Sequence, residues 1–264
     1  MISKVAIVHK HTSKEAEEIS KEIGEYLKLK NIHIEYKELN KLDAIDESHA
    51  DLVIVIGGDG TIVRASHKIN DVPILGIKVG TLGFLCETTP QNAKSVISKI
   101  LSGEYYFDVR SMLDVRYMDK SYYALNEALI TSPIPSKIIH LSLLKDGIIL
   151  HKGRADGIII STSTGASAYA LSAGGAIVDP WVDIIEAIFI CPLSMNLRPF
   201  ILPLSSKIEI ILHNSNGMLI IDGDEVCMVI SEKPVIIEKS KKQVKFIRIE
   251  PYKFYERIKD KMIL

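Results

Sequence analysis

The chain has 264 residues, of which 47% are hydrophobic and 25% charged, as in a globular protein of one or two domains. Its 32 Lys and Arg residues against 33 Asp and Glu residues give a formal net charge of −1, which excludes a global positive field for nucleic acid. No apolar run reaches the roughly 18 residues of a membrane span, and the N-terminal run is too short for a signal peptide. Three widely spaced cysteines without a C-x-x-C pattern argue against a zinc site or a disulfide framework. The sequence therefore predicts a cytoplasmic protein with no nucleic-acid or membrane partner.

Strand and helix patterns alternate over the first hundred residues. Thr12 and Glu15 have the spacing of a capping box at the start of a helix. The run Leu52 to Ile56 is apolar without alternation, which is typical of a strand buried on both faces of a parallel sheet. We therefore predict an N-terminal α/β doubly wound (Rossmann-like) domain at 1–101. Its predicted strands are 4–8, 32–36, 52–56 and 74–78, and its predicted helices are 12–30, 61–68 and a segment after 89–90.

Strand patterns dominate after residue 103. Asp146-Gly147 is the clearest hairpin turn, and residues 164–183 form an interruption that looks helical. We predict a β-rich (β-sandwich-like) C-terminal domain at 102–250, and a C-terminal helix at 251–264 that packs back on the N-terminal domain. The predicted strands are 104–118, 122–131, 138–151, 157–161, 186–191, 207–213, 218–222, 225–230, 234–239 and 243–249.

The sharpest motif is Gly57-Gly58-Asp59-Gly60-Thr61, between the apolar strand and a helix. Ligands bind at this edge of an open parallel sheet, and three glycines let backbone N–H groups approach a phosphate at a helix N-terminus. A carboxylate there repels phosphate unless it meets Mg²⁺ or accepts a hydroxyl proton during phosphoryl transfer. The alternative is a tight turn in which Asp59 bonds its own loop.

A second glycine-rich loop, residues 76–85, follows the strand at 74–78. Its glycines would let it approach the first loop. Lys78 could bring a positive charge to a triphosphate, or could simply be solvated at the surface.

Two further segments are suited to a nucleoside. Asn126-Glu127 offers an amide and a carboxylate for a ribose diol or an adenine edge, although an edge strand with solvated side chains fits equally well. Residues 161–169 form a run of small hydroxyl residues that ends at Tyr169, and could hold a polar planar ligand or act as a helix cap.

In this order, the segments resemble the NAD kinase family, which phosphorylates the adenosine-ribose 2′-hydroxyl of NAD to make NADP. The resemblance covers about 5–203, most of the chain. Its motifs are Gly57 to Thr61, Gly80-x-Leu82-Gly83-Phe84-Leu85, Arg110-x-Met112-Leu113, Asn126-Glu127, Asp156-Gly157, the run 161–169, Arg198-Pro199 and Asp222-Gly223. The chain departs from the family at Lys78, Ser163, Ala166 and Ser167, where many members have Asn, Pro, Ser and Thr.

The resemblance implies a role for each matching residue. Asp59 would be the base or orienting group for the 2′-hydroxyl. The donor loop would consist of Gly57, Gly58, Gly60 and Thr61, and Lys78, which departs from the family, is a further candidate at the donor phosphates because of its charge. The NAD-binding residues would be Asn126, Glu127, Asp156, Thr164, Ser167, Ala168, Tyr169 and Ser172, with Arg154 and Asp222 as further candidates.

The resemblance also implies ATP and NAD as substrates, with inorganic polyphosphate left open as a donor. Mg²⁺ or another divalent metal would be held mainly through the ATP phosphates, with no protein ligand identified. A homodimer or homotetramer would form through the β-rich domain.

Two alternatives remain at this stage. A diacylglycerol or sphingoid lipid kinase also carries a G-G-D-G-T-like loop, but would offer an apolar cleft instead of the hydroxyl cluster. A catalytically silent dinucleotide sensor would have no use for Asp59.

Overall fold

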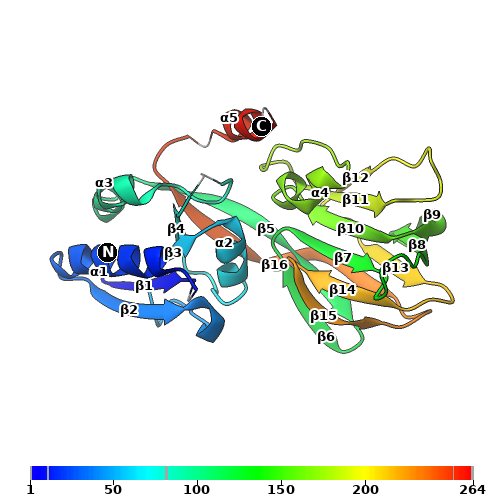
Figure 1. The fold of residues 1–264 in the computed structure, drawn as a ribbon, viewed down its shortest axis with the longest axis horizontal. Helices are drawn as coiled ribbons and strands as arrows, with labels where there is room; N and C mark the ends of the chain where they lie inside the picture. The colour runs from blue at the N-terminus through cyan, green and yellow to red at the C-terminus, as the bar shows by residue number, and fades with distance from the viewer. Residues whose placement is uncertain (1, 11, 81–82, 252, 263–264) are drawn as a thin grey trace. The chain divides into compact units, whose positions relative to one another are not determined.

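The computed structural model describes residues 2–10, 12–80, 83–251 and 253–262 (Figure 1). Leu82 of the second motif and Tyr252 of the predicted C-terminal helix therefore lie outside the described residues. The chain divides into two compact units. The first unit comprises Met1–Arg110 and Lys242–Leu264, and the second comprises Ser111–Lys241. The division falls inside two long strands, whereas the sequence pattern had placed it near residue 101.

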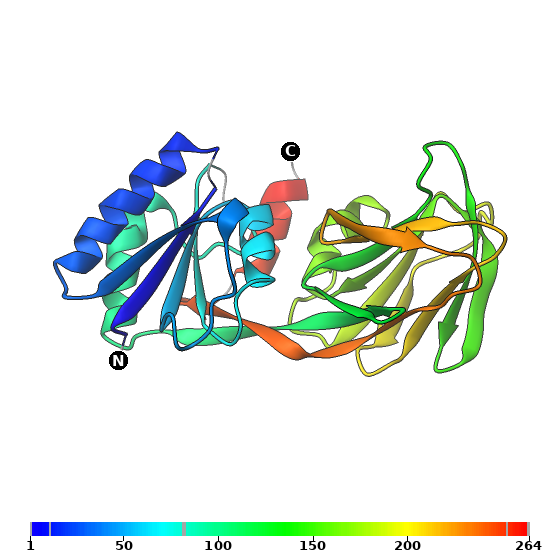
Figure 2. The same ribbon diagram turned by 90° about the horizontal axis from the view of Figure 1, so that it is seen from below.

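The first unit is a parallel sheet between helices. Its strands lie in the order β2-β1-β3-β4, and the sheet continues to the end of β16. Helices α1 and α3 cover one face and α2 the other, where Ile62 packs against Gly76 (Figures 1 and 2). This arrangement confirms the doubly wound α/β fold. The elements are β1 (Lys4–His9), α1 (Lys14–Lys28), β2 (His33–Glu38), η1 (Leu39–Lys41), β3 (Leu52–Gly57), α2 (Asp59–Ser66), β4 (Ile74–Lys78), α3 (Pro90–Leu101) and α5 (Phe254–Met262).

The first helix begins one residue later than the capping box predicts. Ser13, and not Thr12, is the N-cap, and its side chain accepts a hydrogen bond from the backbone N–H of Ala16 at 3.2 Å. A serine hydroxyl serves as a cap as well as a threonine, so the choice between neighbours depends on where the chain enters the helix.

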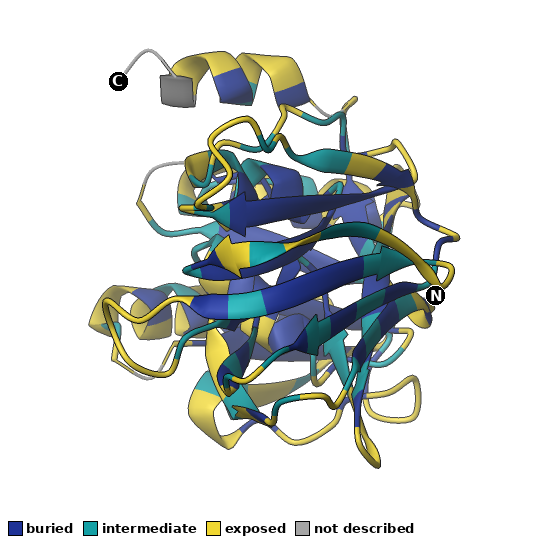
Figure 3. Cartoon of the chain, turned by 90° about the vertical axis from the view of Figure 1, so that its right-hand side faces the viewer, coloured by how far each residue is buried: buried dark blue, intermediate teal, exposed yellow. Residues whose placement is uncertain are grey.

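The second unit is a β-sandwich, which confirms the predicted class. One sheet has the order β12-β11-β10-β7-β14-β15, and β16, β13, β8 and β9 form the facing layer with β5 and β6 beside them. Apolar side chains of both layers form one buried core. Figure 3 shows buried residues along the central strands and exposed residues at the turns. The strands are β5 (Tyr106–Tyr117), β6 (Lys120–Ala124), β7 (Glu127–Thr131), β8 (Ile139–Lys145), β9 (Ile148–Ala155), β10 (Gly157–Thr162), β11 (Ile184–Ile190), β12 (Phe200–Pro203), β13 (Ile208–Leu212), β14 (Gly217–Ile221), β15 (Asp224–Val229) and β16 (Val235–Arg248).

Several predicted elements of this half were wrong in detail. The predicted strand 122–131 is interrupted at Leu125-Asn126, and the two strands predicted within 234–249 form the single strand β16. The polar residues that suggested a break in β16 lie where the strand passes from one unit to the other. The helical interruption contains only η2 (Gly165–Ser167) and α4 (Tyr169–Ser172), and β12 was not predicted.

Candidate active site

The loop from Gly57 to Thr61 connects β3 to α2 at the carboxyl edge of the parallel sheet. Gly58 is the N-cap of α2, and Asp59 is its first residue. A Cβ atom on Gly57 would lie 2.6 Å from Oγ1 of Thr61, so this packing requires glycine. A Cβ atom on Gly60 would meet no described atom within 4 Å. The loop therefore leaves one side open at a helix N-terminus, where an anion is favoured.

The Asp59 side chain ties this loop to the second glycine-rich loop. Its Oδ2 atom accepts a hydrogen bond from the backbone N–H of Phe84 at 2.7 Å, and Oδ1 accepts one from that of Leu85 at 3.2 Å. A Cβ atom on Gly83 would lie 2.1 Å from Oδ1 of Asp59, which excludes any larger residue there. Asp59 thus bonds a neighbouring loop and not its own. Its carboxylate is fixed in place, and each oxygen retains capacity to accept a further hydrogen bond.

Lys78 lies beside the same loop. It ends β4 and pairs in register with Gly57 of β3. Its Nζ atom is so close to Gly58 that a Cβ atom there would lie 3.1 Å from it. The positive charge is therefore near the backbone N–H groups of the loop, which favours a role in holding an anion over that of a merely solvated lysine.

Cys86 is a buried thiol beneath the two loops, and its Sγ atom lies 3.6 Å from the carbonyl oxygen of Gly57. Burial, together with the negative charge of Asp59, raises the pKa of this thiol to about 12. The thiol therefore stays protonated at neutral pH, so Cys86 is suited to packing and not to nucleophilic chemistry.

In the second unit, Asp222 anchors the Asn126-Glu127 segment. Its carboxylate accepts hydrogen bonds from the backbone N–H groups of Leu125, Asn126 and Glu127, at 2.7, 2.9 and 2.9 Å. Asp222 and Gly223 form the tight turn between β14 and β15, with φ values of 49° and 86°. The anchored segment is the interruption between β6 and β7, so the two side chains are not fixed by the alternation of a regular strand.

Glu127 is buried, with 8% of its surface exposed. Its Oε2 atom has no hydrogen-bond partner among the described residues. Burial, reinforced by the negative charge of Asp222, raises the pKa of Glu127 to about 8. The side chain is therefore mostly protonated at neutral pH and can both donate and accept a hydrogen bond, which suits a sugar hydroxyl.

Hydrogen bonds join this segment to the hydroxyl-rich turn after β10. The backbone N–H of Thr162 donates to the carbonyl of Asn126 at 2.9 Å, and its hydroxyl donates to that of Leu125 at 2.7 Å. A Cβ atom on Gly165 would lie 2.3 Å from the carbonyl oxygen of Asn126. Within the second unit, the structure thus brings together two segments that the sequence singled out separately.

The remaining candidates of this turn differ in exposure. Thr164 is buried, and Ser167 uses its hydroxyl to donate to the carbonyl of Thr164 at 3.2 Å. Ala168 is half-buried, whereas Tyr169 and Ser172, the ends of α4, are exposed. Tyr169, with 45% of its surface exposed, is thus available to pack its ring against a planar ligand.

Asp156 and Arg154 lie away from these segments within unit 2. In the β7–β10 pairing, Ser161 is opposite Glu127 and Gly157 is opposite Thr131. Asp156 therefore sits just before the other end of β10, five residues from Ser161 and about 17 Å away at the rise of a strand. Its backbone carbonyl accepts a hydrogen bond from the Thr131 hydroxyl at 2.9 Å.

Sequence reasoning missed Glu186, which is fully buried on β11 beside Ser161. Its Oε1 atom accepts a hydrogen bond from the backbone N–H of Ala176 at 2.6 Å, and burial raises its pKa. Glu186 therefore supports the backbone that follows α4. A lone carboxylate inside the apolar run 184–190 was the signal that could have found it.

The described parts of the chain include no group of three or more His, Cys, Asp or Glu side chains placed to hold a metal ion. They also include no helix long and apolar enough to cross a membrane.

Family models match both halves of the chain. The ATP-NAD kinase N-terminal domain matches residues 34–105, and the ATP-NAD kinase C-terminal domain matches residues 125–249. The chain belongs to the NAD kinase family. It is therefore a phosphotransferase that acts on a hydroxyl group of NAD, and the resemblance drawn from the ordered motifs is confirmed.

Relatives of known function support the same assignment over nearly the whole chain. An NAD kinase of Thermococcus sibiricus is 37% identical over 99% of this chain and 98% of its own. An NAD kinase of Methanothermobacter thermautotrophicus is 34% identical over 98% of this chain and 96% of its own. The crystal structure of an NAD kinase from Archaeoglobus fulgidus in complex with ATP covers 97% of this chain and 96% of its own, with a TM-score of 0.79 and 29% identity. Yeast NADH kinase shares the fold, with a TM-score of 0.89 and 24% identity. The match covers 99% of this chain and 87% of the yeast chain.

Proposed function

We propose that this NAD kinase transfers the γ-phosphoryl group of ATP to the 2′-hydroxyl of the adenosine ribose, with ADP and NADP as products. The observation that carries the proposal is the Asp59 carboxylate, fixed by two backbone N–H groups at the mouth of an open glycine loop. The ATP complex of the Archaeoglobus fulgidus relative supports ATP as the donor.

In the first unit, Asp59 orients the attacking hydroxyl and accepts its proton. The loop backbone of Gly57, Gly58 and Gly60, with Thr61 at the first turn of α2, faces the donor phosphates, and Lys78 adds a positive charge. Phosphoryl transfer passes through a loose transition state, so position and charge neutralisation matter more than full deprotonation of the nucleophile.

Because Lys78 is one of several groups that neutralise charge, Lys78→Ala should raise the KM for ATP only about threefold to tenfold.

Mg²⁺ or another divalent cation fits this site as a companion of the donor. Such a cation is commonly held by substrate phosphates together with one or two carboxylates, and Asp59 is a carboxylate of the loop. The described residues offer no cluster that would hold the cation by itself. When bound, it would neutralise charge on the donor phosphates.

In the second unit, Asn126, protonated Glu127 and the turn containing Thr164, Ser167 and Ala168 bind the adenosine portion of NAD. Tyr169 packs against the base, and Ser172 lies one turn further along α4. Asp222 acts indirectly, by holding the Asn126-Glu127 backbone. Asp156 and Arg154 would serve a different part of the dinucleotide, because Asp156 directly precedes the far end of β10 and Arg154 lies two residues earlier on β9.

The direct test mixes purified protein with NAD, ATP and Mg²⁺ and measures NADP with a dehydrogenase that requires it. NADP formation is expected. Binding of NAD without turnover would indicate a dinucleotide sensor, and phosphorylation of a sphingoid base or diacylglycerol instead of NAD would indicate a lipid kinase. Parallel reactions with polyphosphate as donor and NADH as acceptor define the specificity.

We also propose a homodimer or homotetramer that forms through the β-rich domain and works in the reducing cytoplasm. Exposed isoleucines at the start of β9, Ile148 and Ile149, support a contact surface in this domain. The three cysteines, Cys86, Cys191 and Cys227, are all free, which supports a reducing compartment. Light scattering on the purified protein measures the oligomeric state, and a monomer at working concentration contradicts the proposal.

A further inference from the structure

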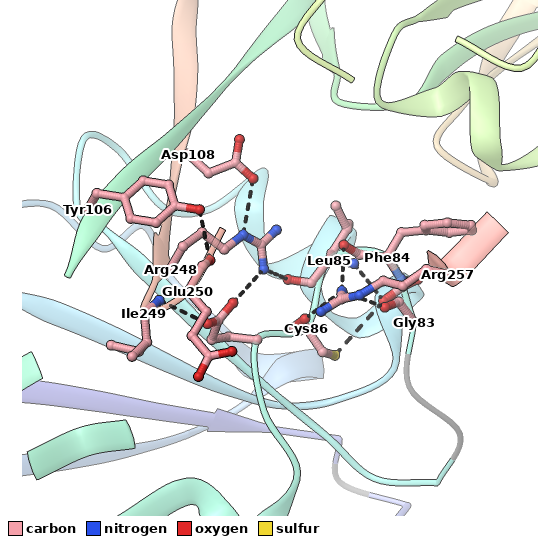
Figure 4. A network of polar contacts seen from close by, with 12 residues as sticks. Gly83, Phe84, Leu85, Cys86, Tyr106, Asp108, Arg248, Ile249, Glu250 and Arg257 are labelled. Carbon is pink, nitrogen blue, oxygen red and sulfur yellow. Dashed lines mark hydrogen bonds and ion pairs between the residues drawn. The ribbon is translucent and has the colours of Figure 1, made fainter. Parts of the chain in front are cut away.

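The C-terminal helix α5 supplies an arginine to the second glycine-rich loop. Nη1 of Arg257 donates to the carbonyl oxygens of Gly83 at 2.8 Å, Phe84 at 3.2 Å and Cys86 at 3.0 Å (Figure 4). Apolar packing holds the helix against the same loop, because Phe254 and Ile258 form a buried cluster with Phe84. One cation thus binds three carbonyls of a four-residue segment, although its residue lies more than 170 positions away in the chain.

Two of these carbonyls belong to the peptide groups that hold Asp59. The peptide between Gly83 and Phe84 accepts from Arg257 through its C=O and donates to Asp59 through its N–H. The peptide between Phe84 and Leu85 does the same. Each peptide therefore lies between a cation and a carboxylate. Because hydrogen bonds in a chain polarise one another, Arg257 strengthens the two N–H groups as donors and fixes their direction.

A second arginine holds the loop from a rigid base. Nη1 of the fully buried Arg248 donates to the carbonyl of Leu85 at 3.1 Å, and its Nε atom donates to Asp108 at 3.1 Å. Asp108 also accepts two hydrogen bonds from the buried Arg110. The bonds of Arg248 to Leu85, Glu87 and Asp108 lie outside the two peptide groups that donate to Asp59. Arg257, which is only half-buried, bonds both of them, and is the arginine whose removal would act on Asp59 with the least damage to the core.

We propose that Arg257 is a positioning residue for phosphoryl transfer, which acts on Asp59 through the two peptide groups of residues 83–85. The inference rests on the proposed role of Asp59. It makes α5 part of the catalytic apparatus, because Arg257 acts through the backbone of residues 83–86 and, in this proposal, does not touch the substrate.

The test compares steady-state kinetics of the full-length enzyme and its variants. Arg257→Ala should lower kcat about 10- to 100-fold, as expected for loss of alignment of a catalytic group, with the KM for NAD changed less than about twofold. Arg257→Lys should have a kcat between those of Arg257→Ala and the wild type. The ammonium keeps the positive charge but can bind fewer of the three carbonyls. Millimolar methylguanidinium should restore part of the activity of Arg257→Ala. Lys253→Ala is the matched control, because it removes an exposed cation one helical turn earlier whose described ion pair is with Glu256.

A double-mutant cycle separates this mechanism from general destabilisation. If Arg257 acts through Asp59, then Arg257→Ala should lower kcat less than about twofold in the Asp59→Asn background. A full additional loss there, or unchanged kcat in Arg257→Ala, would overturn the inference. If Arg257→Ala fails to fold in a thermal melt, Arg257→Lys carries the test, and a wild-type kcat in that variant overturns the inference.

Two outcomes separate the proposed role of Asp59 from that of Arg257. Near wild-type turnover in Asp59→Asn alone would refute the proposed role of Asp59 and this inference with it. A large loss in Asp59→Asn together with wild-type kcat in Arg257→Ala and Arg257→Lys would refute only the role of Arg257.

Discussion

The two units use the same kind of anchor in different electrostatic surroundings. In each, an aspartate carboxylate accepts backbone N–H groups of a segment distant in sequence. Asp59 holds Phe84 and Leu85 in the first unit, and Asp222 holds Leu125, Asn126 and Glu127 in the second. A carboxylate can accept several hydrogen bonds at once, so a single side chain can align two loops.

The charge around the two anchors differs. Lys78 and Arg257 lie beside the segments that Asp59 joins. In the second unit, Glu127 lies next to Asp222. Burial and the negative charge of Asp222 raise the pKa of Glu127 to about 8, so this carboxyl is mostly protonated at neutral pH. Cations suit a unit that handles phosphates, and a neutral donor-acceptor group suits a sugar or a base. The two anchors thus share one geometry and differ in the charge around them, as expected if the first unit binds phosphates and the second a sugar or a base.

The largest expected effect breaks the first anchor. Asp59→Asn should slow turnover at least ~100-fold, because an amide cannot accept the hydroxyl proton, while NAD binding stays nearly intact. Stopped-time NADP assays give kcat, and calorimetric titration with NAD gives the Kd. Turnover close to that of the wild type would show that Asp59 only anchors the loop.

Substitutions at Gly83 and Gly60 test whether the Asp59 carboxylate must be held in place. Gly83→Ala would place a methyl group on the Asp59 carboxylate, so kcat should fall about 10- to 100-fold. Gly60→Ala meets no described atom, so its melting temperature should match the wild type while the KM for ATP rises. Equal kcat values for Gly83→Ala and the wild type would contradict the fixed carboxylate.

Removing the second anchor should affect stability and the acceptor. Asp222→Ala leaves three backbone N–H groups without their partner, at a cost of about 2 to 4 kcal/mol in unfolding free energy and with a raised KM for NAD. Chemical denaturation measures the unfolding free energy. Asp222→Asn keeps one acceptor oxygen and should lose less, and an unchanged KM for NAD in both variants would remove this segment from the acceptor site.

The smallest effect is a dependence of stability on pH. Glu127 has a pKa of about 8 in the folded state and 4.5 as the ordinary value, so the folded state binds this proton more tightly. Its contribution is present at low pH and is lost as pH rises from about 4.5 through about 8. Glu127→Gln should therefore gain melting temperature over the wild type by a few degrees as the pH increases from 5 to 9. A difference that stays constant with pH would place the proton elsewhere.

Local patterns predicted much of this molecule. The apolar run Leu52 to Ile56 predicted a buried strand, and the glycines after it predicted a loop that leads into a helix N-terminus, because both features depend on residues adjacent in sequence. Asp146-Gly147 predicted a hairpin, and both residues have positive φ values, of 50° and 80°. The order of motifs predicted the family, since each motif is short but their sequence of appearance is specific.

Other features had no local signal. The bond from Phe84 to Asp59 spans 25 residues, and those from the 125–127 segment to Asp222 span up to 97. Arg257 looked like one more charged residue on an amphipathic helix, because nothing near it in sequence shows which carbonyls it meets. Leu125-Asn126 looked like the middle of a strand, because the carboxylate that bends the chain there comes from β14 and its turn.

The sequence by itself determined the kinds of element, the two-part architecture and the chemistry that the chain can perform, because periodicity, glycine loops and functional side chains are written in neighbouring residues. Tertiary structure decided which side chain holds which loop, the protonation of Glu127, and the place of Asp156 at the far end of β10. These depend on burial and on hydrogen bonds between segments that meet only after folding, and no local pattern encodes that meeting.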